Sequence, residues 1–463
     1  MLPAISLKHR FLALISCAPF FISCSNAENE KAKNIDSEPK ATVVRTLTAG
    51  TYYSGLSSPG NNVHYDVYLP KGFKRDKQQA TLIFLDPHAD ASVPLKKYEA
   101  LADKYNFMLI GSNDVKNGIS LEDGSTLVDA LVQEVKSSFY VDPLAISIAG
   151  FSGGAKAALA AAYQLPGFST VIYCGAAFPP DFRLVSIPSM GISGTSDMNL
   201  TEVLYYYSSL DSIKSRHSLI VTKSKHEWPD ESAFEQAFAW CMTSRCISGG
   251  YCDKVALQNL LDHSFQIAQK EQDPVFKNLF LQHQYLTYNG LLDITNIERV
   301  ITQNQNTIIF KERYQSFLNE LSRETSMRQM YQEAFASKDL LWWLEQVRSL
   351  NARSADPVNV RLLNFLSLAS YSYSRQSLKE VNLVEADKFL SLYKAADPKN
   401  SEWAFLRACY DAEAGKNSEI IRDLQTSVKL GMNDPEKIRK EPLLAGVLNT
   451  PDVQALLRSL DKK

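Results

Sequence analysis

The sequence has no large excess of charge of either sign and no extended basic segment. Its 49 Lys and Arg residues nearly balance its 51 Asp and Glu residues, which gives a formal net charge of -2 at pH 7. No run of basic residues is longer than three. Domains that bind nucleic acid gather positive charge on one face. This composition therefore gives no reason to expect nucleic acid or another polyanion as a partner.

Cysteine is scarce, with seven in 463 residues, and its spacing does not fit a metal site. Cys241, Cys246 and Cys252 form no Cys-x2-Cys pair and have no neighbouring histidine, whereas structural zinc sites normally use such ligands. We expect neither a metal nor an organic cofactor. A disulfide among these three cysteines would suit an oxidising compartment, but the pairing cannot be read from the sequence. Cys174 lies in an apolar segment and is interpreted as a small buried hydrophobe.

The apolar N-terminal run, residues 11–23, is too short to span a bilayer comfortably. It follows Lys8 and Arg10, and small residues lead into Cys24, an arrangement typical of a targeting signal. The segment resembles a bacterial lipoprotein signal. The resemblance implies that Cys24 is acylated and anchors the protein to a membrane of the bacterial cell envelope, in the periplasm or at the outer membrane. Cys17 is a competing processing site, and simple secretion is the alternative.

The most informative motif is Gly-Phe-Ser-Gly-Gly at residues 150–154. A short apolar segment, 146–149, precedes it, and an alanine-rich segment, 155–163, follows it. Gly-x-Ser-x-Gly is a weak pattern by itself, but a strand before it and a helix after it are the context of a nucleophile elbow. The glycines leave room for a strained turn that exposes the hydroxyl. We predict that Ser152 is a nucleophile, with an accidental glycine-rich turn as the alternative.

A serine hydroxyl needs a general base, and usually a carboxylate that orients the base. Two later strand-like segments end in such residues, in the order that follows an elbow of this kind. Asp197 follows segment 189–193, and His226 follows segment 217–223. We therefore expect Asp197 to orient His226, and His226 to activate Ser152.

Each of these assignments has an alternative. Asp197 ends a Gly-Thr-Ser-Asp sequence that forms turns well, and Asp181 and Asp211 are the other candidate acids. His226 could be an isolated surface histidine, in which case His88 is the other histidine near the carboxyl end of a strand. The remaining histidines lie in the leader, near strand starts or in the later helical region: His9, His64, His217, His263 and His283.

These residues resemble the α/β-hydrolase superfamily, in particular secreted esterases of the feruloyl esterase and polyhydroxyalkanoate depolymerase type. In those enzymes a Gly-Thr-x-Asp turn carries the acid and a His-x-Trp-Pro segment carries the base, as at residues 194–197 and 226–229 here. The likeness covers roughly residues 45–245. It implies a hydrolase that acts on a small ester or an acylated glycan.

The sequence departs from that family where the oxyanion hole is expected. The strand before the first helix usually ends in His-Gly, but here it ends in Asp-Pro-His-Ala, residues 86–89. Because proline has no N–H, we expect the two donors to be the N–H groups of Gly153 and Ala89. His88 could keep an auxiliary role. If Ala89 cannot present its N–H, the domain could be a hydrolase relic that binds ligands without turning them over.

Apolar strand-like segments alternate with helical ones, which predicts an α/β fold with a mainly parallel sheet covered on both faces. The first two strands are expected to be antiparallel. The expected strands are 46–54, 63–69, 81–85, 107–111, 145–150, 170–176, 189–193 and 217–223, and the expected helices are 94–105, 122–139 and 230–243.

Beyond Cys252 the strand signals fade and amphipathic helices follow. The spacing near the C-terminus resembles tetratricopeptide (TPR) repeats. The resemblance implies a concave face that binds a peptide or another protein, and an irregular helical domain is the alternative. Trp342 and Trp343 are interpreted as core rather than groove residues. The residues that carry the resemblance are Ala386, Leu390, Asp397, Pro398, Trp403, Leu406, Tyr410 and Gly415.

These observations predict a lipid-anchored serine hydrolase of the cell envelope that cleaves a carboxylic ester and carries a helical region for partner contact. One rival is a peptidase of the prolyl-oligopeptidase type, which shares the residue order but normally has a β-rich gating domain. The other is a non-catalytic adaptor with a relic hydrolase fold. The expected division is signal peptide 1–24, tether 25–40, α/β-hydrolase domain 41–248, helical domain 249–360 and TPR-like repeats with a cap 361–463.

Overall fold

The computed structural model describes residues 47–58, 60, 62–179, 184–213 and 215–461. Two compact units make up the chain, one ending at Phe317 and the other beginning at Leu318. The boundary between them falls inside helix α9 (Ile308–Phe335). Cys17, Cys24 and the predicted tether lie outside the described residues. Within the described ranges, no helix is both long and apolar enough to cross a membrane.

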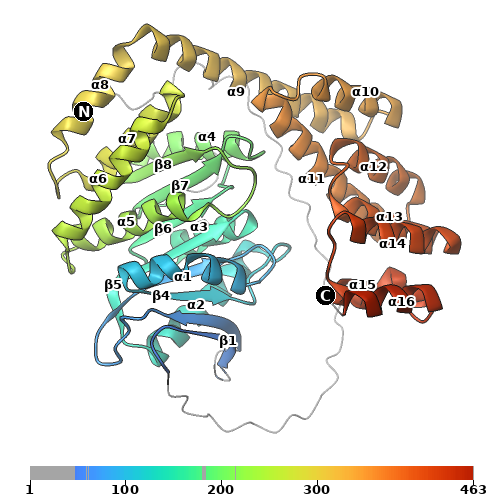
Figure 1. Ribbon diagram of the computed structural model, residues 1–463, viewed down its shortest axis with the longest axis horizontal. Helices are drawn as coiled ribbons and strands as arrows, with labels where there is room; N and C mark the ends of the chain where they lie inside the picture. Colours follow the sequence, from blue (N-terminus) through green and yellow to red (C-terminus); the bar gives the residue numbers. More distant parts are fainter. Residues whose placement is uncertain (1–46, 59, 61, 180–183, 214, 462–463) are drawn as a thin grey trace. The chain divides into compact units, whose positions relative to one another are not determined.

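A mostly parallel sheet of eight strands forms the centre of the first unit (Figure 1), in the order β1-β2-β4-β3-β5-β6-β7-β8. Strand β2 pairs antiparallel with both β1 and β4, and the other neighbours are parallel. The predicted α/β fold is therefore confirmed. The strands are β1 Thr51–Ser58, β2 Val63–Leu69, β3 Gln79–Leu85, β4 Phe107–Ser112, β5 Val141–Phe151, β6 Thr170–Cys174, β7 Ser189–Gly194 and β8 His217–Thr222.

The first strand differs from its predicted bounds. It runs over Thr51–Ser58 instead of 46–54, because it pairs with the whole of β2, from Thr51 opposite Leu69 to Ser58 opposite Val63. The register shifts between Tyr53 and Leu56. Pairing with a fixed partner thus sets the length of the strand, which alternation of residue types alone does not reveal.

Helices cover both faces of the sheet. One face carries α1 (Ser92–Tyr105) and α5 (Glu231–Ile247), and the other carries α2 (Leu121–Ser138), α3 (Gly153–Gln164) and α4 (Leu200–Leu210). Helix α4 was not predicted. Its three consecutive tyrosines, 205–207, are weak helix formers. The helix forms because its buried side chains pack on β7 and β8.

An aromatic cluster packs α1 and α5 onto the sheet near the carboxyl ends of the strands. The rings of Tyr98 from α1 and Phe234 from α5 stack with centroids 3.9 Å apart. Phe84 from β3 and Trp228 from the loop before α5 pack against them, at 5.6 Å and 6.4 Å from Phe234. The loop that follows β8 is thereby attached to the hydrophobic core.

Three further helices belong to the first unit: α6 (Lys254–Lys270), α7 (Pro274–Tyr288) and α8 (Thr295–Asn306). Helix α7 lies against β8, where Ser218 Oγ is 2.7 Å from His283 Nδ1. The half-buried Arg216 guanidinium stacks on Trp240 at 3.8 Å, and desolvation by burial lowers its pKa to about 10. Its hydrogen-bond acceptors are neutral groups of α5 and α7: Thr243 Oγ1, Ser244 Oγ and the carbonyls of Leu286 and Thr287.

The cysteines agree with two of the predictions. Cys246 and Cys252 form a disulfide that joins the end of α5 to the segment before α6. Cys174 and Cys241 are buried free thiols. The turn after α5 brings Cys252 back to Cys246. The sequence alone did not reveal this turn, so it left the pairing open.

The second unit is helical throughout its described residues. Helices α11 and α12 pack against each other, as do α13 and α14, and each pair is joined by a three-residue turn, which makes its members antiparallel neighbours. Gly415 lies in the second turn with φ of +69°. Trp343 is fully buried, as predicted. Besides the end of α9, the elements are α10 Leu340–Asn351, α11 Pro357–Lys379, α12 Leu383–Ala396, α13 Ser401–Glu413, α14 Asn417–Lys429, α15 Pro435–Lys440, the 3-10 helix Pro442–Val447 and α16 Pro451–Leu460.

Candidate active site

Ser152 occupies a sharp turn between β5 and α3. Its backbone φ is +54°, which is unusual for a residue with a side chain. A Cβ on Gly150 would lie 2.0 Å from the Gly154 carbonyl oxygen, and a Cβ on Gly154 would lie 2.0 Å from the Leu85 carbonyl oxygen. Both glycines are therefore required for the close approach of the α3 N-terminus to β5 and β3. The motif has the backbone of a nucleophile elbow.

The structure brings the three predicted side chains together from three strand ends. Ser152 Oγ lies 2.9 Å from His226 Nε2, and His226 Nδ1 lies 2.9 Å from Asp197 Oδ1. Asp197 is 1% exposed, so its carboxylate is shielded from water. With the imidazole Nδ1–H donating to the carboxylate, Nε2 is free to accept the serine proton. The arrangement can generate an activated serine nucleophile.

Two residues that the sequence analysis missed fix the acid. The Asn199 N–H donates to Asp197 Oδ1 at 2.8 Å, and the Asn199 side chain donates to the Gly175 carbonyl at 2.9 Å. Gly175 has φ of +63°, and a Cβ there would lie 2.9 Å from Asp197 Oδ2 and 3.3 Å from His226 Nδ1. Gly175 directly follows the apolar strand β6, and this position is the one signal in the sequence that could have identified it.

The other candidate acids and histidines lie elsewhere. Asp211 is 3.2 Å from His217 Nε2 rather than beside His226, and Asp181 lies outside the described residues. His283 is buried in α7, where burial lowers the pKa of its imidazole to about 3. The His88 ring is largely exposed, with Nδ1 3.6 Å from Asp86 Oδ1.

The two expected oxyanion donors differ in their availability. The N–H of Gly153, at the first position of α3, has no acceptor among the described residues. The N–H of Ala89 donates to the Asp86 carbonyl at 3.1 Å, in a turn where Ala89 has φ of +57°. The neighbouring His88 N–H donates to Asp86 Oδ1 at 2.9 Å. Only the Gly153 donor is presented in this arrangement.

A second loop lies against the start of α3. A Cβ on Gly153 would meet Asn117 Oδ1 at 1.7 Å, so the Asn117 carboxamide contacts the Gly153 backbone. The Asn117 N–H donates to the Pro87 carbonyl at 2.8 Å, which joins this loop to the segment after β3. Nothing in the local sequence of Asn117 marks it as a neighbour of the elbow, so no role could be predicted for it.

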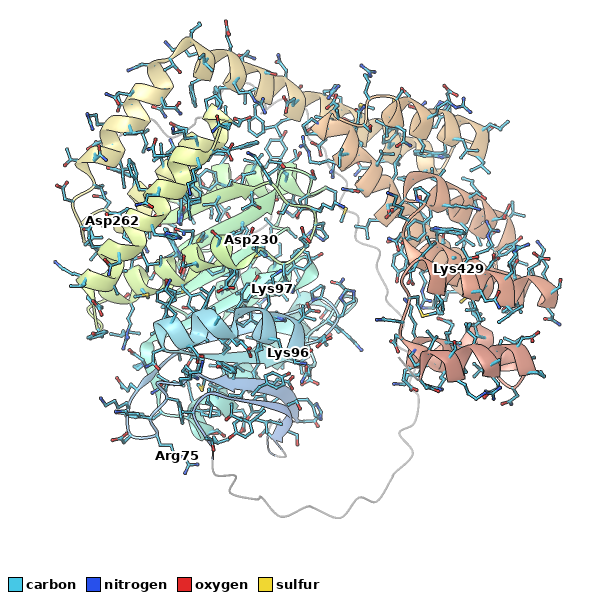
Figure 2. The ribbon with its side chains drawn as sticks, viewed as in Figure 1. Arg75, Lys96, Lys97, Asp230, Asp262 and Lys429 are labelled. Atoms are coloured by element: carbon cyan, nitrogen blue, oxygen red, sulfur yellow. A yellow bond between two sulfur atoms is a disulfide. The ribbon has the colours of Figure 1, made fainter. Side chains whose placement is uncertain are left out.

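The loop that carries His226, residues 223–230, is anchored through the two residues Trp228 and Pro229 that follow shortly after the histidine. Lys97 Nζ, from the lysine labelled in Figure 2, donates to the Trp228 carbonyl at 3.0 Å. The Tyr98 hydroxyl donates to the Pro229 carbonyl at 2.7 Å. The Trp228 indole N–H donates to Asp86 Oδ2 at 2.8 Å. We refer to residues 223–230 as the His226 loop.

Sheet order, elbow and strand-end residues together define the fold. The elbow follows β5, and the acid and the histidine follow β7 and β8, which is the chain order of α/β-hydrolases. Among the described residues, no cluster of His, Cys, Asp and Glu is arranged to hold a metal ion.

Comparison with known proteins gives distant similarities. No protein-family model and no curated protein matches the sequence. The chain is similar to the fluorophosphonate-binding serine hydrolase FphF of Staphylococcus aureus, with 18% identity, 42% of this chain and 98% of that chain covered, and a TM-score of 0.36. It is also similar to a ferulic acid esterase, with 16% identity, 43% of this chain and 100% of that chain covered, and a TM-score of 0.37. A third similarity is to an acylaminoacyl peptidase of Pyrococcus horikoshii, with 13% identity, 41% of this chain and 40% of that chain covered, and a TM-score of 0.32.

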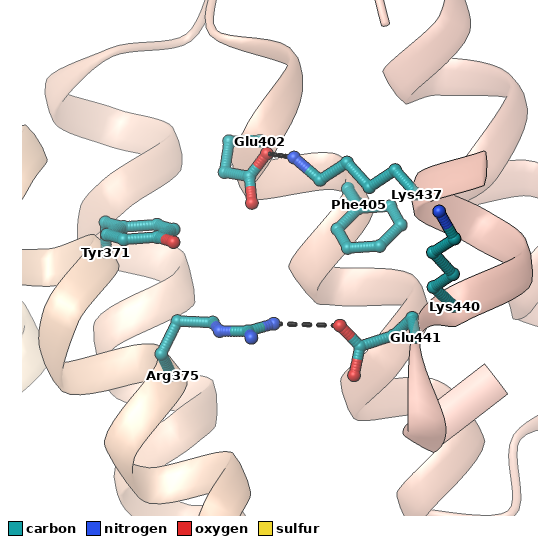
Figure 3. Close-up of a pocket in the computed structure, with 7 residues that line it drawn as sticks. All are labelled: Tyr371, Arg375, Glu402, Phe405, Lys437, Lys440 and Glu441. Atoms are coloured by element: carbon teal, nitrogen blue, oxygen red, sulfur yellow. Dashed lines mark hydrogen bonds and ion pairs between the residues drawn. The ribbon is translucent and has the colours of Figure 1, made fainter. Parts of the chain in front are cut away.

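The second unit contains a charged pocket of about 260 Å³ (Figure 3). Two ion pairs cross it, Arg375 with Glu441 at 2.9 Å and Lys437 with Glu402. The pairs join α11 and α13 to α15 and the residue after it, so they also hold the C-terminal helices in place. A larger pocket of about 820 Å³ is lined by residues of α10, α12, α13 and α14, with one from the turn before α14.

Proposed function

We propose that this protein is a serine hydrolase that cleaves a carboxylic ester. The observation that carries the proposal is the continuous hydrogen-bonded chain from Ser152 through His226 to Asp197, placed on a strained elbow. Such an elbow costs free energy to hold, on the order of 1–3 kcal/mol, and strain of this kind persists mainly at functional sites.

The proposed reaction follows from the roles of the three residues. Ser152 Oγ attacks the ester carbonyl while His226 Nε2 takes the hydroxyl proton, and Asp197 stabilises the imidazolium that forms. The tetrahedral intermediate then expels the alcohol, which receives the proton from Nε2, and an acyl-enzyme remains on Ser152. Water, deprotonated by the same imidazole, hydrolyses the acyl-enzyme and restores the serine.

The negative charge on the tetrahedral oxygen needs hydrogen-bond donors. Gly153 supplies one N–H directly. For Ala89 to supply a second, its N–H has to leave the Asp86 carbonyl that it now contacts, which requires a small movement of the turn when substrate binds. This engaged donor is also the observation that favours the adaptor alternative, in which the hydrolase fold binds without turnover.

We further propose that the substrate is a small ester or an acylated glycan and that the protein is anchored in the bacterial cell envelope through Cys24. The disulfide between Cys246 and Cys252 supports an oxidising compartment. The lipoprotein-like N-terminal sequence supports the anchor. Replacing Cys24 with Ser should release the protein from the membrane fraction.

For the second unit we propose contact with a protein or peptide partner through TPR-like repeats. The paired helices α11–α12 and α13–α14 support this, because stacked helix pairs present a concave surface along one set of helices. The pocket in Figure 3 is lined by residues of α11, α13 and α15 and by Glu441. Helices α11 and α13 are the first members of the two pairs, so they belong to one such set of helices.

Turnover of a substrate panel tests the proposed activity. The protein without residues 1–24 should hydrolyse p-nitrophenyl esters and leave aminoacyl p-nitroanilides intact, and Ser152→Ala should abolish the reaction. Cleavage of the anilides at a comparable rate would support a peptidase instead. A folded protein that turns over neither class would support the adaptor.

A further inference from the structure

Asp86 is a buried carboxylate that contacts two separate parts of the site. It is the first residue after β3 and is 4% exposed. Its Oδ2 accepts the Trp228 indole N–H at 2.8 Å, and its Oδ1 accepts the His88 backbone N–H at 2.9 Å. A buried carboxylate is costly unless such bonds compensate for the lost water. Burial alone would raise the pKa of the Asp86 carboxyl, but its hydrogen bonds leave the pKa below the ordinary value.

The bond to Trp228 connects Asp86 indirectly to His226. Trp228 lies two residues after His226 and is 6% exposed. Its ring packs on Phe151, with centroids 5.5 Å apart, and the Phe151 ring in turn packs on the His226 ring at 4.7 Å. The depth of the indole in the core therefore sets where the imidazole lies. The bond to Asp86 fixes that depth.

The other bond reaches the segment that is expected to complete the oxyanion hole, residues 86–91, which we call the 86–91 loop. Besides the His88 bond, its end is held by Asn113 Oδ1, which accepts the Ala91 N–H at 3.1 Å. The carboxylate of Asp86 thus fixes the start of this loop, and Asn113 fixes its end. Ala89 lies between the two fixed points.

We propose that Asp86 is a positioning residue that ties the His226 loop to the 86–91 loop, and so keeps the base and the turn at Ala89 in register with Ser152. The inference rests on the proposed function. A carboxylate suits this task because both of its oxygens only accept hydrogen bonds. An asparagine would turn its NH2 group towards one of the two N–H donors and lose one of the links.

Kinetics of four variants test the proposal. Asp86→Asn should lower kcat for a p-nitrophenyl ester about a hundredfold, since misplacement of reacting groups by about 1 Å costs that much. Its KM should change less than about twofold, as for an interaction made in the transition state. Trp228→Phe removes the indole donor together with the five-membered ring, keeps an aromatic ring at this position, and should lower kcat in the same way. The double variant should be no slower than Asp86→Asn, because the loss of either link already separates the two loops.

Glu235→Gln is the matched control. Glu235 is another buried carboxylate of the same unit, 6% exposed, which accepts from Lys104 Nζ at 2.7 Å and from the Tyr105 hydroxyl at 2.6 Å. It does not contact the site residues described above. Glu235→Gln should therefore lower the melting temperature while leaving kcat within about twofold of wild type.

The outcomes separate the two proposals. An active wild type whose Asp86→Asn and Trp228→Phe variants keep their kcat overturns the role of Asp86 and leaves the proposed function intact. Equal losses of kcat in Asp86→Asn and Glu235→Gln also overturn it, because they indicate general destabilisation. An inactive wild type overturns the proposed function and this inference together. If Asp86→Asn does not fold, Trp228→Phe decides between the first two outcomes.

Discussion

The two units of this chain differ in where residues have positive φ. In the first unit, hydrogen bonds join residues far apart in sequence, such as Trp228 and Asp86, and two residues with side chains, Ser152 and Ala89, have positive φ beside the candidate site. In the second unit, positive φ occurs at the turns between helices, as at Val381 and Gly415. Positive φ in the segments after strands therefore distinguishes the candidate site of the first unit from the helical second unit.

The largest expected effect tests whether the active site lies in the first unit. Ser152→Ala or His226→Ala should each lower kcat on the order of 10⁶-fold, because the two residues act as a unit. Thermal unfolding should change little, since neither side chain fills the core. Steady-state kinetics at matched protein concentration measure the loss. Residual activity within tenfold of wild type would place the chemistry elsewhere in the chain.

A buried ion pair gives the corresponding test for the second unit. Glu324 is fully buried, 2.6 Å from Arg361 and 2.9 Å from Arg328. Glu324→Gln removes the carboxylate charge beside the buried Arg361 and should destabilise the second unit by about 3–5 kcal/mol. Hydrogen exchange of peptides from α9 to α11 measures the change. Ester hydrolysis should persist, and its loss would contradict an active site confined to the first unit.

A pair of glycine substitutions compares the backbones of the two units. Gly150→Ala places a methyl group 2.0 Å from the Gly154 carbonyl oxygen, whereas Gly446→Ala meets nothing within 4 Å. We expect Gly150→Ala to destabilise the first unit by about 1–3 kcal/mol and to reduce turnover, and Gly446→Ala to change stability by less than about 0.5 kcal/mol. Thermal melts and ester kinetics measure both. Equal behaviour of the two variants would mean that the elbow tolerates side chains.

The smallest expected effect is a difference in the sign of the pH dependence. In the first unit, the pKa of buried His283 is lowered to about 3, so the unfolded chain binds the extra proton and stability falls as pH drops from about 6.5. In the second unit, burial and the neighbouring Asp423 raise the pKa of Asp411 to about 6. The folded state then binds more protons than the unfolded chain, and stability falls as pH rises between about 4 and 6.

Variants isolate these two contributions. His283→Gln should flatten the acid-side loss of the first unit by about 1.4 kcal/mol per pH unit at most, and Asp411→Asn should remove the opposite trend of the second unit. Hydrogen exchange at pH 5 and 7, resolved by peptide, distinguishes the units. Parallel pH trends in both variants would show that other groups dominate.

Much of the candidate site could be predicted from sequence order alone. Ser152, Asp197 and His226 each end a recognisable apolar segment, and parallel strands bring their carboxyl ends to one edge of the sheet. The engagement of Ala89 could not be predicted, because it depends on how a turn closes onto its own carbonyl. Asp86 was seen only as a departure from the usual motif.

The residues that support the site were missed for a common reason. Trp228 and Asp86 are 142 positions apart, and no local pattern relates them. Asn117 and Asn199 act through contacts of their loops with distant glycines. Helix α4 was missed because tertiary packing overrides the weak helix preference of its tyrosines. Local periodicity identifies the elements, whereas contacts between distant loops complete the site.

The central claim is that Ser152 is an activated nucleophile, and covalent labelling tests it most directly. The protein without residues 1–24 should react with a fluorophosphonate probe, and mass spectrometry of the digested product should locate the adduct on Ser152. Labelling should disappear in Ser152→Ala and in His226→Ala. A folded wild type that stays unlabelled, or an adduct on another residue, would contradict the account.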